Sequence, residues 1–175
     1  QWQFMTAVHE RCVLEADEEQ RNRVNASAEE PKRLFCHGLP GSGKTQVMHW
    51  LAEYFEEVWG WIQGRQFVYL APLNSMASRI NGFTVHSWGE VEGATDTATG
   101  SKTFKSGSAN VRDMSSMSSK CEWCRWLFID ESEATAAKTL GSMEQNVAEA
   151  TRRRSYKYRG GIERPEHLRF FGGLN

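Results

Sequence analysis

The stretch CHGLPGSGKTQVMHWL, residues 36–51, decides the fold class, because a glycine-rich turn leads directly into an apolar run with helical spacing. Gly38 to Thr45 fit the pattern G-x-x-x-x-G-K-[ST] of a phosphate-binding loop, the P-loop. Backbone N–H groups of such a loop converge on phosphate oxygens, and side chains would block this approach. The stretch therefore predicts a loop that holds a nucleotide's phosphates between a strand and a helix. The alternative is a flexible glycine turn without a ligand.

The residue types in this loop have distinct expected tasks. The ammonium group of Lys44 reaches the β- and γ-phosphates, and the hydroxyl of Thr45 ligates Mg²⁺. The helix that starts here directs the positive end of its dipole at the anion. The other nucleotide-binding positions of the loop are Gly38, Pro40, Gly41, Ser42 and Gly43.

A second motif, WLFIDES at residues 126–132, indicates which of the reactions of P-loop proteins this chain would catalyse. Asp130 follows a short apolar strand, where its carboxylate can hold Mg²⁺ through water. Glu131 can orient and deprotonate an attacking water molecule. Alone, such an acidic pair can equally begin a helix, where acids suit the dipole. Because the loop lies upstream with another strand between, we predict NTP hydrolysis with Lys44 and Glu131 as catalytic residues.

The elements expected around these motifs alternate between helix and strand, which predicts an α/β domain with a mostly parallel sheet. Apolar residues at helical spacing predict which side chains face the core. In the first helix these are Trp2, Met5, Val8 and Cys12, and in the helix after the loop they are Val47, Met48, Leu51, Phe55 and Val58. We expect helices over residues 2–30, from the loop to Gly60, and over 134–154, and strands over 33–37, 66–71 and 126–130.

Composition bounds the remaining possibilities. The chain has 175 residues with 21 Lys+Arg and 22 Asp+Glu, so one domain is expected and no overall charge attracts a nucleic acid or a membrane. No apolar stretch is long enough to span a membrane and no leader pattern precedes the first helix, which predicts an intracellular, unsecreted protein. Residues 93–119 are rich in Gly, Ser, Thr and Ala, and a mobile insertion is expected there.

The four cysteines are Cys12, Cys36, Cys121 and Cys124, of which the last two form a C-x-x-C pair. One such pair supplies two ligands, whereas a structural zinc site needs four. Reduced thiols are therefore the preferred interpretation, and a zinc site is the alternative.

Four segments together resemble the first motor domain of the petite-integration-frequency (PIF-type) DNA helicases of superfamily one. They are GLPGSGKT at 38–45, LAPLNSMASRINGFTVHSW at 70–88, WLFIDE at 126–131 and RFFGGLN at 169–175. The second is the most informative, because that family has a strand ending in an Ala-Pro turn and then a Gly-x-Thr-Ile-His-Ser segment. The resemblance implies a three-layer, RecA-like P-loop fold that binds ATP and Mg²⁺, with Gln1 where the family carries an adenine-reading glutamine.

The resemblance also implies a binding surface for single-stranded DNA. Its members are Pro72, Asn74, Ser75, Met76, Thr84, His86 and Ser87. Backbone amides and polar side chains of this kind contact phosphates, and Trp88 offers a ring on which a base can stack. The alternative for His86 and Trp88 is packing beneath the sheet. The basic, tyrosine-containing run at 152–164 is either a further DNA contact or a solvated helix end.

By the same resemblance, residues 1–175 are a C-terminally truncated part of the first motor domain, and a second motor domain is expected but missing. Such a piece alone should bind Mg-ATP weakly, hydrolyse it slowly and unwind nothing. The family further implies 5′-to-3′ movement, roles in DNA repair, recombination and telomere maintenance, and a nuclear or mitochondrial location. Two other functions stay open, namely a P-loop kinase and a non-catalytic remnant that binds nucleotide or DNA.

Overall fold

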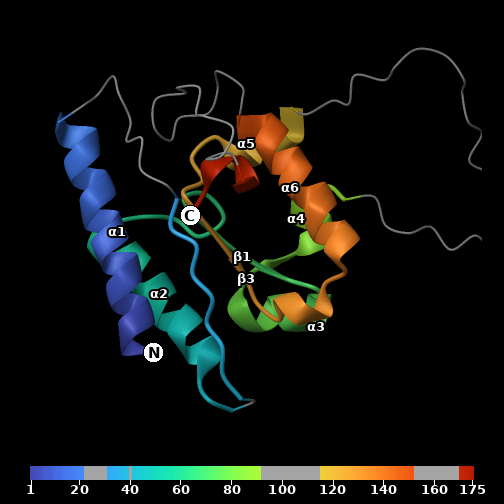
Figure 1. The fold of residues 1–175 in the computed structure, drawn as a ribbon, viewed down its shortest axis with the longest axis horizontal. Coiled ribbons are helices and arrows are strands. Elements are labelled where there is room, and N and C mark those ends of the chain that lie inside the picture. The colour runs from blue at the N-terminus through green and yellow to red at the C-terminus, as the bar shows by residue number, and fades with distance from the viewer. Residues whose placement is uncertain (22–30, 40, 92–114, 152–169) are drawn as a thin grey trace, which may run out of the picture.

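The computed structural model describes residues 1–21, 31–39, 41–91, 115–151 and 170–175. Helices separate the three parallel strands along the chain, as Figure 1 shows. In chain order the elements are α1 (Trp2–Arg21), α2 (Lys44–Trp59), β1 (Phe67–Ala71), α3 (Asn74–Ala77), η1 (Ser78–Ile80), β2 (Phe83–Thr84), α4 (Val85–Gly89), α5 (Ser115–Cys121), β3 (Trp126–Ile129), η2 (Ser132–Ala134), α6 (Ala137–Thr151) and η5 (Phe170–Gly173).

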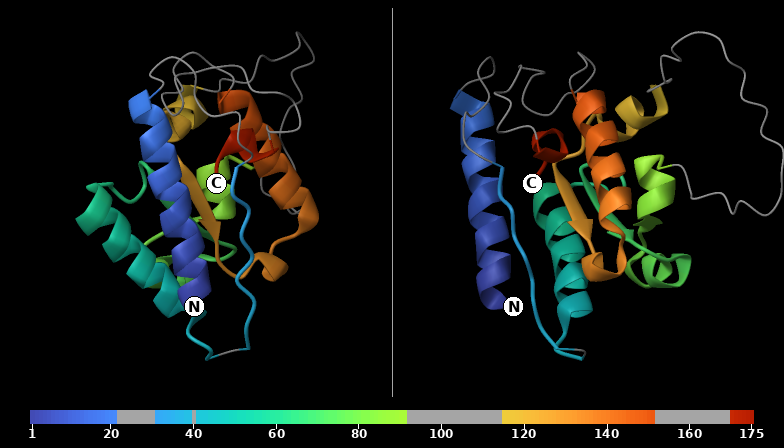
Figure 2. Two further views of the ribbon diagram at one scale, coloured as in Figure 1. Left: turned by 60° about the vertical axis from the view of Figure 1, so that its left-hand side comes forward. Right: turned by 45° about the vertical axis from the view of Figure 1, so that its right-hand side comes forward.

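The three strands form one parallel sheet in the order β2-β1-β3. Helices α1 and α2 lie on one side of the sheet and α4, α5 and α6 on the other, which gives three layers (Figure 2). Parallel sheets are covered on both faces, and all five residues of β1 are buried accordingly. The predicted α/β fold class is confirmed.

Alternate residues of β1 serve the two cores, because successive side chains of a strand point to opposite faces. Phe67, Tyr69 and Ala71 belong to the core that α1 and α2 cover, which also contains Val8, Cys12, Val47, Leu51, Phe55 and Trp126. Val68 and Leu70 belong to the opposite core, whose other buried members include Trp88, Met117, Met143 and Val147.

Helix α2 begins at Lys44 and ends at Trp59, and Gly60 takes the left-handed conformation that closes it. The predicted stripe is correct for Val47, Leu51 and Phe55 but wrong for Val58, which is 62% exposed. The buried residues Val47, Leu51 and Phe55 recur every four positions, and Trp59 continues this series. Trp59, and not Val58, is therefore the partly buried residue at the end of α2. In α1 the prediction was wrong for Trp2, which is 83% exposed at the first helical position.

The strand predicted at residues 33–37 is not formed. The segment 31–39 runs beside β3 without joining the sheet (Figures 1 and 2). Cavities lined by Leu34, Phe35, Leu127 and Ile129 separate the two, whereas paired strands must lie about 4.8 Å apart. The outer edge of β3 instead bonds to Asn175, which accepts from the Leu127 N–H at 2.9 Å and donates to the Arg125 carbonyl at 2.9 Å.

Other boundaries differ from the prediction by a few residues. The expected insertion at 93–119 extends too far, because residues 115–119 belong to α5 and Met117 is fully buried. Residues 22–30 of the first predicted helix, 93–114 of the insertion and the basic run at 152–164 lie outside the described residues. The last helix starts at Ala137, after the short turn η2, and is described to Thr151.

The cysteines are free thiols, and Cys12, Cys121 and Cys124 are buried in the cores. Among the residues that the structure describes, no three His, Cys, Asp or Glu side chains are grouped as a metal site. None of the helices in the described ranges combines the length and apolar character needed to cross a bilayer.

Candidate nucleotide-binding site

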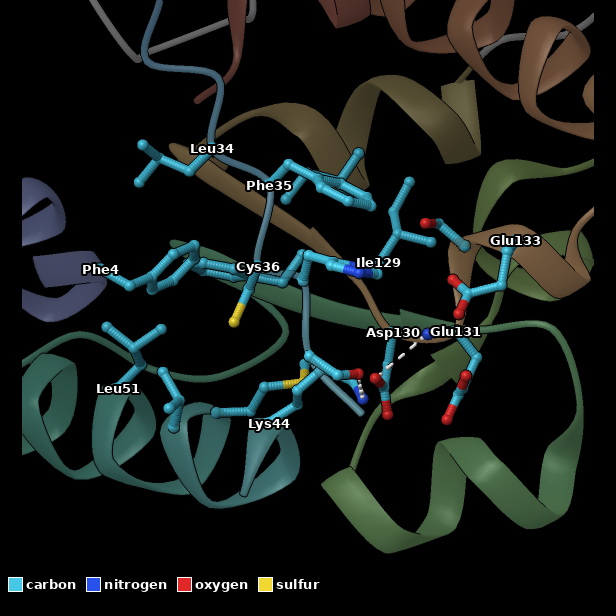
Figure 3. A pocket seen from close by; sticks show the side chains of 17 residues that line it. Phe4, Leu34, Phe35, Cys36, Lys44, Leu51, Ile129, Asp130, Glu131 and Glu133 are labelled. Carbon is cyan, nitrogen blue, oxygen red and sulfur yellow. Dashed lines mark hydrogen bonds between the residues drawn. The ribbon is translucent and has the colours of Figure 1, made fainter. Parts of the chain in front are cut away.

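A cavity of about 180 Å³ lies between α2, the 34–38 segment and the carboxyl end of β3 (Figure 3). Its walls bring together Gly38 and Lys44 of the loop with Asp130 and Glu131 after β3. In Figure 3 the acidic side chains lie on one side of the cavity, and Phe4 and Leu51 lie on the other. The two motifs, far apart in the sequence, therefore share one site.

The loop before α2 has the backbone that a phosphate cradle needs. Gly41 and Gly43 have φ angles of 77° and 86°, in the left-handed region that glycine tolerates. A Cβ at Gly43 would collide with the side-chain amide of Gln1, and a Cβ at Gly41 would meet nothing within 4 Å. The space around Gly41 is open and the helix N-terminus follows directly, so these residues fit a bound phosphate group.

Lys44 folds back over this loop. Its Nζ donates to the Gly38 carbonyl at 2.8 Å and to the Leu39 carbonyl at 3.4 Å. The ammonium group thus lies among oxygen acceptors in the cavity wall, where phosphate oxygens could replace the carbonyls. Thr45 is half-buried in the first turn of α2, Ser42 is exposed, and Pro40 lies outside the described residues.

Gln1 lies against the loop, and its side-chain amide donates to the Ser42 carbonyl at 2.8 Å. The structure therefore places this residue beside the phosphate-binding loop, although the two are distant in sequence.

Asp130 and Glu131 are set by the end of β3. The Asp130 backbone N–H donates to the Leu70 carbonyl at 2.8 Å, which extends the parallel ladder by one residue. Glu131 then takes a left-handed conformation, with φ 48° and ψ 44°, and its N–H donates to Asp130 Oδ1 at 3.1 Å. Such a conformation is uncommon for a residue with a side chain, and strained residues of this kind are among those found at functional sites.

The site contains residues that the sequence analysis missed. Glu133 adds a third carboxylate to the cavity wall, and Phe4 and His37 line it as well. The repeat of acids at Asp130, Glu131 and Glu133 was a signal that could have identified Glu133. No local sequence pattern indicated that Phe4 lines the cavity, because only the packing of α1 brings Phe4 there.

The residues predicted to contact DNA follow β1 and β2. Asn74, Ser75, His86 and Ser87 are exposed, and Pro72, Met76 and Thr84 are half-buried. Because parallel strands end at one edge of a sheet, these residues lie at the same edge as Asp130. Met76 packs on the core beside α2, and the Thr84 hydroxyl accepts the Ser87 N–H at 3.1 Å as the cap of α4.

The stacking role considered for Trp88 is wrong. Trp88 is 3% exposed and packs in the core between the sheet and α6, so no base can reach its ring. Helical spacing within α4 explains this, because His86 and Ser87 occupy the solvent side and Val85 and Trp88 the buried side. The alternative of packing beneath the sheet is therefore correct for Trp88 and wrong for His86.

Comparison with known proteins places the chain in a family. No curated protein and no solved structure matches the chain. A family model described as an AAA domain matches residues 15–154, which include the loop before Lys44 and the acids after β3. With the parallel α/β fold and the shared cavity, this match shows that the chain belongs to the AAA domain family of P-loop proteins.

Proposed function

We propose that the chain is an ATP-hydrolysing motor domain of a DNA helicase that resembles the PIF type. The observation that carries this proposal is the shared cavity, in which Lys44 faces the acids Asp130 and Glu131. Phosphate binding by a loop and water activation by a strand-end acid are the two parts that NTP hydrolysis requires.

Several residues of the site could hold the nucleotide and its ion. The backbone of residues 41–45 and the Lys44 ammonium would bind the phosphates, and Gln1, which lies next to the loop, would contact the adenine. Thr45 and Asp130 would hold Mg²⁺, which neutralises charge that develops on the phosphates. These groups combine one hydroxyl and one carboxylate, which is how Mg²⁺ is commonly held together with substrate phosphates.

Glu131 is the proposed general base. Its side chain is exposed at the cavity wall, so water has access to the carboxylate. Its backbone is left-handed directly after Asp130, and the proposal gives Asp130 the ion-binding task and Glu131 the proton-accepting task. A general base placed in this way contributes typically 10²- to 10⁴-fold to the rate.

The sheet connects the proposed nucleotide site with the residues proposed to bind DNA. Leu70 of β1 pairs with Ile129 of β3 on one side and with Phe83 of β2 on the other. The acids follow β3, the 72–76 segment follows β1 and enters α3, and the 84–87 segment spans the end of β2 and the start of α4. We therefore expect a displacement at Asp130 to move the neighbouring strand ends, and with them the residues proposed to hold single-stranded DNA.

The finer parts of the proposal rest on the family resemblance. They are 5′-to-3′ movement, work in DNA repair, recombination and telomere maintenance, a nuclear or mitochondrial location, and cooperation with a second motor domain. Phosphate transfer to an acceptor other than water, without a response to DNA, would favour a kinase instead.

Two substitutions test the division of tasks within the site. Lys44→Ala should raise the Kd of a fluorescent Mg-ATP analogue about 10- to 100-fold, because a charge-assisted contact worth about 1.5–3 kcal/mol is lost. Glu131→Gln should leave this Kd within about threefold of wild type and lower single-turnover phosphate release by about 100-fold or more.

Glu57→Gln is the matched control, because Glu57 is an exposed acid on α2 that does not line the cavity. It should change neither measurement. Equal loss of nucleotide binding in Lys44→Ala and Glu131→Gln would reject the proposed tasks.

A further inference from the structure

The exposed residues His86 and Ser87 belong to α4, a helix too short to be stable without contacts to other elements. Helix α4 has five residues, and helices this short are marginal in isolation. Its last carbonyl groups also lack partners within the helix, as at every helix C-terminus. The orientation of this segment therefore depends on side chains from other elements.

Lys120 of α5 supplies the first of these side chains. Its Nζ donates to the Trp88 carbonyl at 3.1 Å and to the Ser87 carbonyl at 3.4 Å, and it pairs with Glu90 Oε1 at 2.9 Å. An ammonium group has three N–H donors, and these three partners use all of them. A cation at a helix C-terminus also stabilises the helix through its dipole. Lys120 thus fixes α4 and has no donor left for a DNA phosphate.

Asn146 of α6 supplies the second side chain. It is 6% exposed, and its Nδ2 donates to the Gly89 carbonyl at 2.7 Å and to the Glu90 carbonyl at 3.4 Å. Gly89 itself packs so closely on Met143 that a Cβ would collide with it. The C-terminal end of α4 is therefore held from α5 and α6 together.

We propose that Lys120 is a positioning residue for single-stranded DNA, and that Asn146 assists it. Lys120 holds α4 so that His86 and Ser87 face the phosphate backbone, and it does not touch the DNA. This inference rests on the proposed function, because it assumes that the 84–87 segment binds DNA. It assigns a binding-related task to α5, an element that the sequence motifs do not include.

The salt dependence of binding distinguishes positioning from direct contact. Each phosphate contact to a single strand contributes about 0.7 to the slope of log K against log salt concentration. Lys120→Met should raise the Kd of a fluorescent oligo-dT about three- to tenfold, the range for a residue that acts through its neighbours. The slope between about 50 and 200 mM salt should equal that of wild type, because no phosphate contact is lost.

Two variants accompany this measurement. Lys120→Gln retains an amide that can donate to the Ser87 and Trp88 carbonyls, so its Kd should lie between those of wild type and Lys120→Met. It also serves if Lys120→Met fails to fold. Lys32→Met removes a charge from an exposed side chain in the 31–39 segment, on the other side of the sheet from α4, and should bind as wild type does.

Three results would overturn the inference. A slope lowered by about 0.7 in both Lys120 variants would make Lys120 a direct phosphate contact. Unchanged affinity in a folded Lys120→Met would mean that α5 does not position the segment. Absence of oligo-dT binding by the wild-type chain would reject the DNA-binding proposal itself, and this inference with it.

Discussion

Gly82 directly precedes β2 and lies so close to the backbone of β1 that a side chain would not fit. Its N–H donates to the Ala77 carbonyl at 2.9 Å, and β2 begins at the next residue. A Cβ at this position would collide with the carbonyl oxygen of Tyr69 and lie 2.9 Å from the carbonyl carbon. Since both contacts are with backbone of β1, a larger residue must displace one strand from the other.

We therefore expect Gly82→Ala to lower the free energy of unfolding by about 1–3 kcal/mol, which is typical of overpacking. Gly141→Ala is the matched substitution, because Gly141 is an exposed position within α6 where a Cβ would meet nothing within 4 Å. It should raise the free energy of unfolding by about 1 kcal/mol through helix propensity. Urea denaturation measures both, and changes of the same sign would contradict this explanation.

The buried cysteines predict that the free energy of unfolding depends on pH. Burial raises the pKa of Cys12 and of Cys121 from 9.0 to about 12, and it raises the pKa of Cys124 as well. Between these values the unfolded chain releases thiol protons that the folded chain retains, so the free energy of unfolding should fall as pH rises above about 9. At pH 8 a thiol reagent should modify the half-buried Cys36 first. Rapid labelling of all four thiols in the folded protein would contradict the burial.

At the level of residues, the sequence predicted the central part of the site and not its surroundings. Lys44, Asp130 and Glu131 belong to local patterns whose chemistry is readable from neighbouring residues, and all three line one cavity. Phe4 and Lys120 reach their partners only through the packing of α1 and α5. Contacts between distant elements have no local pattern, so these residues could not be predicted.

Helical spacing describes most of the burial of α2, the helix that follows the loop. Leu51 is fully buried between α1 and the sheet, whereas Val58 is 62% exposed. Leu51→Ala should lower the free energy of unfolding by about 2–5 kcal/mol, because a cavity remains in the core. Val58→Ala should change it by less than about 0.5 kcal/mol. Chemical denaturation measures the pair, and a similar cost for both would mean that the exposed face of α2 has been assigned incorrectly.

The 31–39 segment shows why the remaining elements could not be predicted. Its apolar residues Leu34, Phe35 and Cys36 fit a buried strand as well as β1 does, but a strand also needs a partner at pairing distance. Here Asn175 occupies the start of the outer edge of β3, and cavities separate the segment from the rest of that edge. Pairing depends on residues far away in the sequence, whereas burial and helical spacing are local.

At the scale of the whole molecule, the walls of the cavity come from elements that strand pairing does not connect. Its walls come from the start of α1, the unpaired 34–38 segment, α2 and the end of β3. The hydrogen bond from Gln1 to the Ser42 carbonyl and the Lys44 contact with Gly38 already link three of these parts through the loop. A nucleotide that binds the loop and the acids would add the link to β3.

Saturating Mg-ATP should therefore slow hydrogen exchange in the 34–38 segment and in α2, and it should raise the melting temperature. At a concentration 100 times the Kd, the stabilisation amounts to about 2.7 kcal/mol. Lys44→Ala, with a Kd raised about 10- to 100-fold, should retain only about 0.4–1.4 kcal/mol of this stabilisation at the same concentration, with correspondingly weaker protection. Those amides of α6 that exchange through local opening should be slowed less than the 34–38 segment, because α6 does not line the cavity. Protection confined to α6, or an equal rise in melting temperature for Lys44→Ala, would place the nucleotide elsewhere, because neither result can come from a ligand held between the loop and Asp130.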